Sequence, residues 1–209
     1  MTEVTLPARS TRPARRTQAD RRAQTRSALV EAAARGLSRH GYSNLVLERV
    51  AADAGYTRGA LYHLFAGKED LALAVVDWVR DAWYAEVGSL MDDAPDPVDA
   101  LMAVARGHAV FCRRDVARVM TTLRIEFAGD DHPVARRLRE AERQLVADCS
   151  RLITTGRRSG AIPPGPPVRA MARAYLGTME GVVINLAGQA PHDAVLAERA
   201  VRGVLGLAP

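Results

Sequence analysis

The residues best suited to chemistry lie between Thr57 and Lys68. The Arg58 guanidinium can bind the O6 and N7 of a guanine through two hydrogen bonds, or it can clamp a phosphate. Lys68 is the only lysine among the 29 basic side chains, and it lies where a helix is expected to begin. Since a helix dipole disfavours a cation at that end, an anion docked nearby would explain its position. The two side chains favour a polyanionic partner, with a solvated surface arginine as the alternative for Arg58.

One pair of residues has the spacing of a metal site. His108 and Cys112 are four residues apart, which places them on one face of a helix, and imidazole and thiolate suit zinc or copper. Metal sensing and ordinary core packing both fit this pair, and no metal is assigned. The residues further along the chain that could add ligands are Glu126, Asp130, Asp131 and His132.

Enzyme signatures are absent from the sequence. It contains no GxGxxG, no Walker loop, no HExxH and no GxSxG motif. We therefore expect a protein that is not an enzyme and that needs no cofactor. Its two cysteines, Cys112 and Cys149, are too few and too far apart for a disulfide framework, so we expect two reduced, buried thiols.

The surplus of positive charge is confined to the first third of the chain. Residues 1–70 hold 12 of the 29 basic and 7 of the 24 acidic residues, a surplus of five that equals the net charge of the whole chain. The remaining residues hold 17 of each sign. A basic segment beside a neutral body is typical of a nucleic-acid-binding head on a globular partner domain. Charge alone would also suit an anionic membrane surface.

No segment of the sequence is expected to span a bilayer. Apolar stretches such as 181–187 are broken within about eight positions, far below the roughly 20 residues that a membrane helix needs. The basic N-terminus is followed by no apolar stretch that could act as a secretory signal. These features predict a cytoplasmic protein.

Three helices are predicted in the basic segment. Apolar residues recur every four positions over 19–40, a second helix spans 47–54, and a third runs from Thr57 to Leu64. Gly55 can supply a left-handed turn between the last two, and Thr57 can cap the third helix. Two short helices joined by a glycine turn form a helix-turn-helix. An unrelated three-helix cluster would show the same pattern.

The rest of the chain predicts six further helices, which gives an all-α fold of about nine. They are expected over 68–91, 96–113, 115–127, 133–155, 168–187 and 191–207, with a loop over 156–167. The helix over 168–187 is almost uncharged, so it must be buried on more than one side. It fits either the centre of this domain or, together with the last helix, a subunit interface through Gly177, Gly181 and Ile184.

The head also carries specific motifs, TRSALVEAAARGLSRHGY over 25–42 and LERVAADAGYTRGALYHLFAGKEDL over 47–71. Together they resemble the DNA-binding signature of the tetracycline-repressor (TetR) family. The resemblance implies a homodimeric repressor whose two heads bind the halves of a pseudo-palindromic DNA operator and are released by a small molecule. The chain would then divide into a basic, disordered arm over 1–18, a helix-turn-helix domain over 19–67 and a helical domain for effector binding and dimerisation over 68–209.

The resemblance also implies which residues touch DNA. In that family the third helix enters the major groove, and the positions that match are Thr57, Arg58, Gly59, Ala60, Tyr62 and His63. Lys68 matches a lysine that contacts a backbone phosphate. Thr25 and Tyr42 match further positions that contact phosphate or pack the head, and Tyr42 equally suits the core.

Two positions depart from the family pattern. Val46 replaces the Ser or Thr that commonly caps the second helix and touches phosphate, and Leu64 replaces a His or Tyr that commonly faces DNA. Both contacts are expected to be absent. Arginines near the N-terminus could compensate by lying along the DNA backbone or in the minor groove, or they could belong to a solvated tail; they are Arg9, Arg12, Arg15, Arg16, Arg21 and Arg22.

The residues expected to line an effector pocket are four aromatic side chains, one methionine and two polar side chains. They are Trp78, Trp83, His108, Phe111, Met120, Arg124 and Phe127, and they favour a partly apolar effector. Each of them also suits the core. The alternative functions are a metal-responsive module and a non-specific nucleic-acid-binding module.

Overall fold

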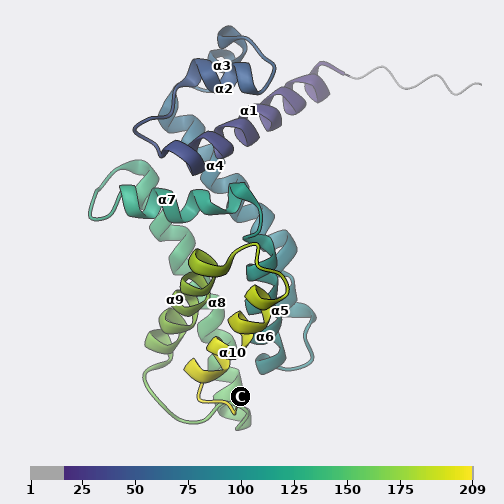
Figure 1. Ribbon diagram of the computed structural model, residues 1–209, viewed down its shortest axis with the longest axis vertical. Coiled ribbons are helices and arrows are strands. Elements are labelled where there is room, and N and C mark those ends of the chain that lie inside the picture. Colours follow the sequence, from purple (N-terminus) through teal and green to yellow (C-terminus); the bar gives the residue numbers. More distant parts are fainter. Residues whose placement is uncertain (1–16, 209) are drawn as a thin grey trace, which may run out of the picture.

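The computed structural model describes residues 17–208, and every regular element in that range is helical (Figure 1). This confirms the predicted all-α class. The molecule is elongated, with a small head at one end and a larger helical body at the other. The arm predicted over 1–18 lies outside the described residues up to position 16, together with Arg9, Arg12, Arg15 and Arg16, whereas Arg21 and Arg22 lie on the first helix.

The head consists of α1 (Gln18–His40), α2 (Leu47–Asp53) and α3 (Arg58–Leu64). A capping box starts α1, because the Thr17 hydroxyl accepts from the amide of Asp20 and the Asp20 carboxylate accepts from the amide of Thr17. Residues 17 and 18 therefore belong to this helix and not to the arm. Gly55 takes the left-handed conformation predicted for the turn, with φ +77°.

The starts of the two short helices follow the expectations from sequence. The Thr57 hydroxyl caps α3 by accepting from the amide of Ala60 at 3.2 Å. Val46 precedes α2 and provides no side-chain cap. Leu61 and Phe65 are buried in the core, and Leu64 packs beside them half-buried. These contacts fix how α3 sits on α1.

The body begins with α4 (Lys68–Trp83), which runs out of the head. It continues through the π-turn η1 (Tyr84–Gly88) and α5 (Leu90–Asp93), so the single helix predicted over 68–91 is interrupted. Asp96 caps α6 (Pro97–Phe111) as predicted, by accepting from the amides of Val98 and Asp99. The helix predicted over 115–127 starts as the 3-10 turn η2 (Asp115–Arg118) and continues as α7 (Val119–Glu126).

The last three helices are α8 (Pro133–Ser159), α9 (Val168–Leu186) and α10 (His192–Val204). The predicted start of the loop at residue 156 is wrong, because α8 continues to Ser159. Gly156 is needed for close packing: a Cβ there would lie 2.7 Å from Cδ1 of Ile162. The helix ends instead at Gly160, which has φ +80°. None of the helices in residues 17–208 combines the length and the apolarity that a membrane crossing demands.

One hydrophobic core runs through both parts of the molecule. It begins with Leu29 in α1, continues with Val75 in α4 and reaches Tyr175 in α9, all fully buried. The Tyr175 hydroxyl donates to the carbonyl of Leu101 in α6 at 2.6 Å, which satisfies the one polar atom of its side chain. Cys149 is buried as expected, but Cys112 is only half-buried; both are free thiols.

Candidate functional site

One face of α3 is open to solvent. Leu61 and Phe65 hold the helix against the core, so the side chains on the opposite side point outward. The exposed residues are Thr57, Arg58, Gly59, Tyr62 and His63, and Ala60 is half-buried. At Gly59 an added Cβ would meet only the Thr57 hydroxyl, at 3.8 Å. Packing within the chain therefore does not require glycine at this position.

On this face, Arg58 contacts two neighbouring side chains. Its Nε lies 3.1 Å from Oε1 of Glu48 on α2, and its guanidinium carbon lies 5.3 Å from the centre of the Tyr62 ring. All three side chains are exposed, so the ion pair contributes little to stability. Its effect is to hold the guanidinium above α3, where a partner docking on this face would meet it.

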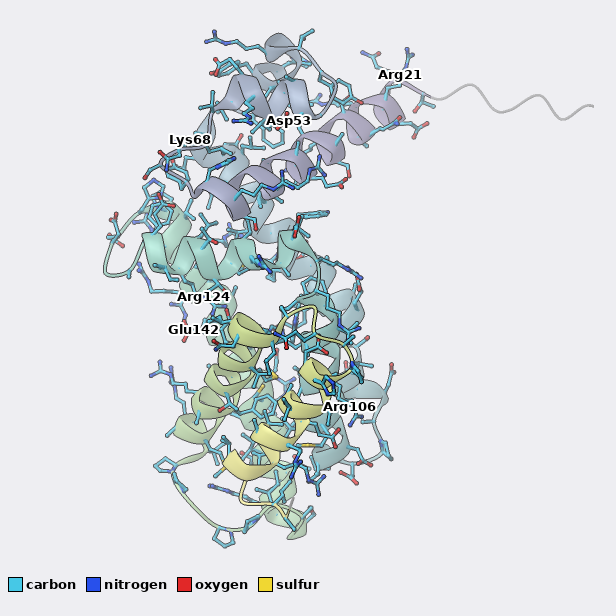
Figure 2. The ribbon with its side chains drawn as sticks, in the orientation of Figure 1. Arg21, Asp53, Lys68, Arg106, Arg124 and Glu142 are labelled. Atoms are coloured by element: carbon cyan, nitrogen blue, oxygen red, sulfur yellow. The ribbon has the colours of Figure 1, made fainter. Side chains whose placement is uncertain are left out.

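Lys68 lies at the junction between the head and the body. Its ammonium donates to the carbonyl of Ser43 at 2.8 Å and lies 4.9 Å from the centre of the Tyr42 ring. One of its three donors is thus used, and the other two remain for an anion. Figure 2 shows Lys68 beside the loop that joins α1 to α2. Thr25 on α1 is half-buried, and its hydroxyl donates to the carbonyl of Arg21.

The same loop is fastened to α7 by one carboxylate. Glu126 accepts hydrogen bonds from the amides of Tyr42 (2.5 Å) and Ser43 (2.7 Å) and from the Ser43 hydroxyl (2.5 Å). We call this arrangement the Glu126 clamp. Partial burial opposes ionisation of Glu126, but the bonds from Ser43 and Tyr42 lower its pKa below the ordinary value. The clamp ties the loop between α1 and α2 of the head to α7 of the body.

The body contains a cavity of about 650 Å³ between α4, α6, α7, α8 and α9. Much of its wall is apolar, including Trp83, Phe111, Met120 and Leu176. Charged side chains also line it, among them Arg124 from α7 and Glu142 from α8, which Figure 2 labels. A mostly apolar cavity with a few converging polar groups is the usual form of a small-molecule site.

Glu180 is the centre of the polar end. It accepts a short hydrogen bond from the Thr121 hydroxyl, and its two oxygens lie 3.7 Å from Nη1 of Arg124 and 3.7 Å from Nε2 of His108. Burial raises the pKa of Glu180, but the nearby His108, the charge of Arg124 and the hydrogen bond from Thr121 outweigh it and lower the pKa to about 2. The carboxylate is therefore ionised at neutral pH.

His108 experiences opposing influences. Burial lowers its pKa, whereas contacts with Cys112 and Glu180 raise it. The indole N–H of Trp83 donates to Nδ1 of His108 at 3.0 Å, however, and an indole nitrogen can only donate. A fully protonated ring would set one N–H against another. We therefore assign the neutral ring with its proton on Nε2, facing Glu180.

The residues with metal-site spacing do not converge. Cys112 Sγ lies 3.6 Å from His108 Nε2, but Glu126 is used in the clamp and His132 stacks on Phe127 with ring centres 4.6 Å apart. Within residues 17–208, no three His, Cys, Asp or Glu side chains gather as a metal site would need. The metal-responsive alternative gains no support from this geometry.

The comparisons with known proteins agree with the geometry of the head. Residues 29–75 match the family model described as bacterial regulatory proteins, tetR family. The chain is 26% identical to the HTH-type transcriptional repressor BepR of Brucella suis over 183 residues, which cover 83% of this chain and 86% of that protein.

Residues 29–75 therefore identify the head as that of the TetR family. The unrelated three-helix cluster is therefore the wrong interpretation of the head. Solved structures share the fold. SCO4454 from Streptomyces coelicolor, a TetR-family regulator, has TM-score 0.73 and 23% identity over 88% of this chain and 95% of that chain. AibR, solved in complex with isovaleryl coenzyme A and operator DNA, has TM-score 0.74 and 22% identity over 88% of this chain and 100% of that chain.

This TetR-family protein brings together five of the seven residues expected to line a pocket: Trp83, His108, Phe111, Met120 and Arg124. The other two lie elsewhere. Trp78 packs half-buried against the core, because five residues along a helix carry it to a different face from Trp83. Phe127 follows the end of α7 and packs edge-on against Tyr42, with ring centres 5.1 Å apart.

The sequence reasoning missed several cavity residues, of which Glu180 matters most. A signal was present, because Glu180 is the single acidic residue on α9. The residues Gly177, Gly181 and Ile184 are exposed on α9 and also line the cavity, whereas Tyr175 and Met179 on the other side are in the core. Within one subunit α9 is thus buried on one side only.

Proposed function

We propose that this TetR-family protein is a homodimeric transcriptional repressor, which binds a pseudo-palindromic operator and releases it when a small molecule occupies the cavity. The observation that carries the proposal is the solvent-facing side of α3 within the first 70 residues, which together hold the whole surplus of positive charge. In this proposal α3 enters the major groove through Thr57, Arg58, Gly59, Ala60, Tyr62 and His63. Lys68 and Thr25 contact phosphates, and Tyr42 positions the loop beside them.

Related proteins support the two binding activities. BepR is named a transcriptional repressor, and AibR was crystallised with both a coenzyme A thioester and its operator. The cavity gives this chain a place for an effector, lined by Trp83, His108, Phe111, Met120 and Arg124. We propose a cytoplasmic regulator without enzymatic activity, with the boundary between head and body at residues 67 and 68.

A second copy of the chain is proposed to cover α9 and α10. Large apolar side chains are exposed on both helices: Ile184 is 62% exposed, Val195 52% and Leu196 42%. Such side chains on neighbouring helices are typical of a subunit interface. Replacing Ile184 with Glu should convert the dimer to a monomer in light scattering, and an unchanged mass would place the interface elsewhere.

The test of the whole proposal is DNA binding measured by fluorescence anisotropy. Duplexes from the DNA that flanks the coding region are compared with scrambled duplexes at two salt concentrations. A regulator gives a salt-dependent, sequence-selective signal that saturates at one or two dimers per site. Equal binding to scrambled DNA at every salt concentration would favour the non-specific module instead.

A further inference from the structure

We infer that the effector is an anionic amphipath, in which an apolar body fills the cavity and a carboxylate or similar acceptor binds Arg124. This inference rests on the proposed function, since it names the ligand of the same cavity. It concerns ligand chemistry only, so it can be tested in the absence of DNA.

The apolar body is required by the cavity wall. Trp83, Phe111, Met120 and Leu176 come from four different helices and surround a volume of about 650 Å³. Water in such a space finds few hydrogen-bonding partners, and an apolar group that displaces it is favoured. A small polar metabolite would leave most of this wall uncovered.

Arg124 is the group at the polar end whose donors are incompletely used. Its Nη1 lies 3.7 Å from Glu180, which is beyond hydrogen-bond range, and its Nε is buried without any partner among the described residues. A buried donor without an acceptor is unfavourable. A ligand carboxylate could accept two hydrogen bonds from this guanidinium in the fork geometry that arginine prefers.

Glu180 is the residue that could instead select a cation, and its partners argue against that. Its oxygens face Thr121, His108 and Arg124, and the Arg124 guanidinium 3.7 Å away would repel a cationic ligand that approached this carboxylate. A ligand anion would instead meet the donors of Arg124 that have no partner among the described residues.

The other charges around the cavity leave this balance unchanged. Arg80 is engaged by Asp77 and Asp81 at 3.0 and 2.7 Å. Glu142 and Arg173 also line the cavity, and neither forms an ion pair with a described residue. Glu142 is half-buried and Arg173 is exposed, so solvent reaches both charges.

The test uses three unbranched probes of ten carbons each: decanoate, decanamide and decylamine. Binding is followed by the fluorescence of Trp83 in a Trp78→Phe background, because Trp83 lines the cavity and Trp78 does not. We expect decanoate to bind at least about tenfold more tightly than the other two probes, as a charge-assisted bond to arginine allows. Arg124→Gln should remove this preference.

The matched control is Arg106→Gln. Arg106 is also an arginine of the body, but it pairs with Glu198 away from the cavity (Figure 2), so this variant should keep the preference for decanoate. Glu180→Gln provides a second variant in case Arg124→Gln folds poorly. Removal of the competing carboxylate should tighten decanoate binding, whereas a site that selects cations would lose its binding of decylamine.

Equal binding of the three probes, tighter binding of decylamine, or no binding of any probe would each overturn the inference. The proposed function fails in a different way. If decanoate binds through Arg124 but leaves operator binding unchanged at saturation, the ligand chemistry stands and the release mechanism is refuted.

Discussion

The head and the body use their side chains for recognition in different ways. The candidate DNA-contacting face of the head comes mainly from α3, a helix of seven residues whose outward side chains are exposed. The cavity of the body is built from five helices, and its polar end brings together side chains from α4, α6, α7 and α9. A site on one helix can be recognised in the sequence, because its residues are neighbours there. A site between helices exists only once the helices have packed.

Charge is also handled differently in the two regions. The ion pair of Arg58 with Glu48 in the head is exposed and therefore weak, which leaves both groups free to exchange partners. The Glu180 carboxylate in the body is mostly buried and is held by three neighbours. Substitutions at Glu180, Arg58, Glu126 and Lys68 test this contrast.

Glu180 should give the largest effect, on stability against pH. Its pKa is about 2 in the folded protein and 4.5 ordinarily, so its contribution is complete above about pH 4.5. That contribution is lost as the pH falls towards 2. This difference in pKa corresponds to a contribution of roughly 3 kcal/mol to the free energy of unfolding. Urea unfolding of wild type and Glu180→Gln from pH 7 to 3 measures it.

The control for Glu180 is Glu48→Gln in the head, which removes an exposed carboxylate whose ion pair with Arg58 contributes little to stability. An identical pH profile for Glu180→Gln and wild type would mean that the buried charge of the body stabilises no more than the exposed charge of the head.

Arg58 should have the largest effect on DNA binding. Arg58→Ala removes a bidentate contact and should cost roughly 1–3 kcal/mol for the operator, while affinity for scrambled duplexes changes little. Competition anisotropy with operator and scrambled duplexes separates the two effects. Arg49→Ala, an exposed arginine on α2, controls for the loss of charge alone. If Arg58→Ala weakens binding to every duplex equally, Arg58 contacts a phosphate and not a base.

The Glu126 clamp should show how firmly the head is joined to the body. Glu126→Gln keeps the shape but replaces charge-assisted hydrogen bonds with neutral ones, a loss of about 1 kcal/mol. Hydrogen exchange of the amides of Tyr42 and Ser43 should then be several-fold faster. Glu69→Gln, an exposed acid near His132, should leave that exchange unchanged. Unchanged exchange in Glu126→Gln would mean that core packing alone holds the loop.

Lys68 should give the smallest change. Lys68→Ala removes one phosphate contact, so it should weaken binding about equally for all duplexes and reduce the slope of log affinity against log salt by about 1. Anisotropy titrations at several salt concentrations measure the slope. Lys68→Arg should retain it. If affinity falls while the slope stays the same, Lys68 acts through its bond to the Ser43 carbonyl.

Local signals predicted the head well. The cap at Thr57, the turn at Gly55 and the buried position of Leu61 all follow from residue types a few positions apart. The same kind of signal located Asp96 at the start of α6. The end of α8 was harder to predict, because Gly156 lies inside the helix and does not end it. Its lack of a side chain leaves room for Ile162.

The sequence by itself determined the helical class, the family of the head and the division of charge between the two regions. These properties depend on composition and on spacings of three to four residues, which the local backbone fixes. Only the tertiary structure decided that Glu126 binds a loop 84 residues earlier, that Glu180 faces Arg124, and that Trp83 but not Trp78 lines the cavity. The physical reason is that such contacts depend on how whole helices cross, and the crossing is set by packing of the shared core.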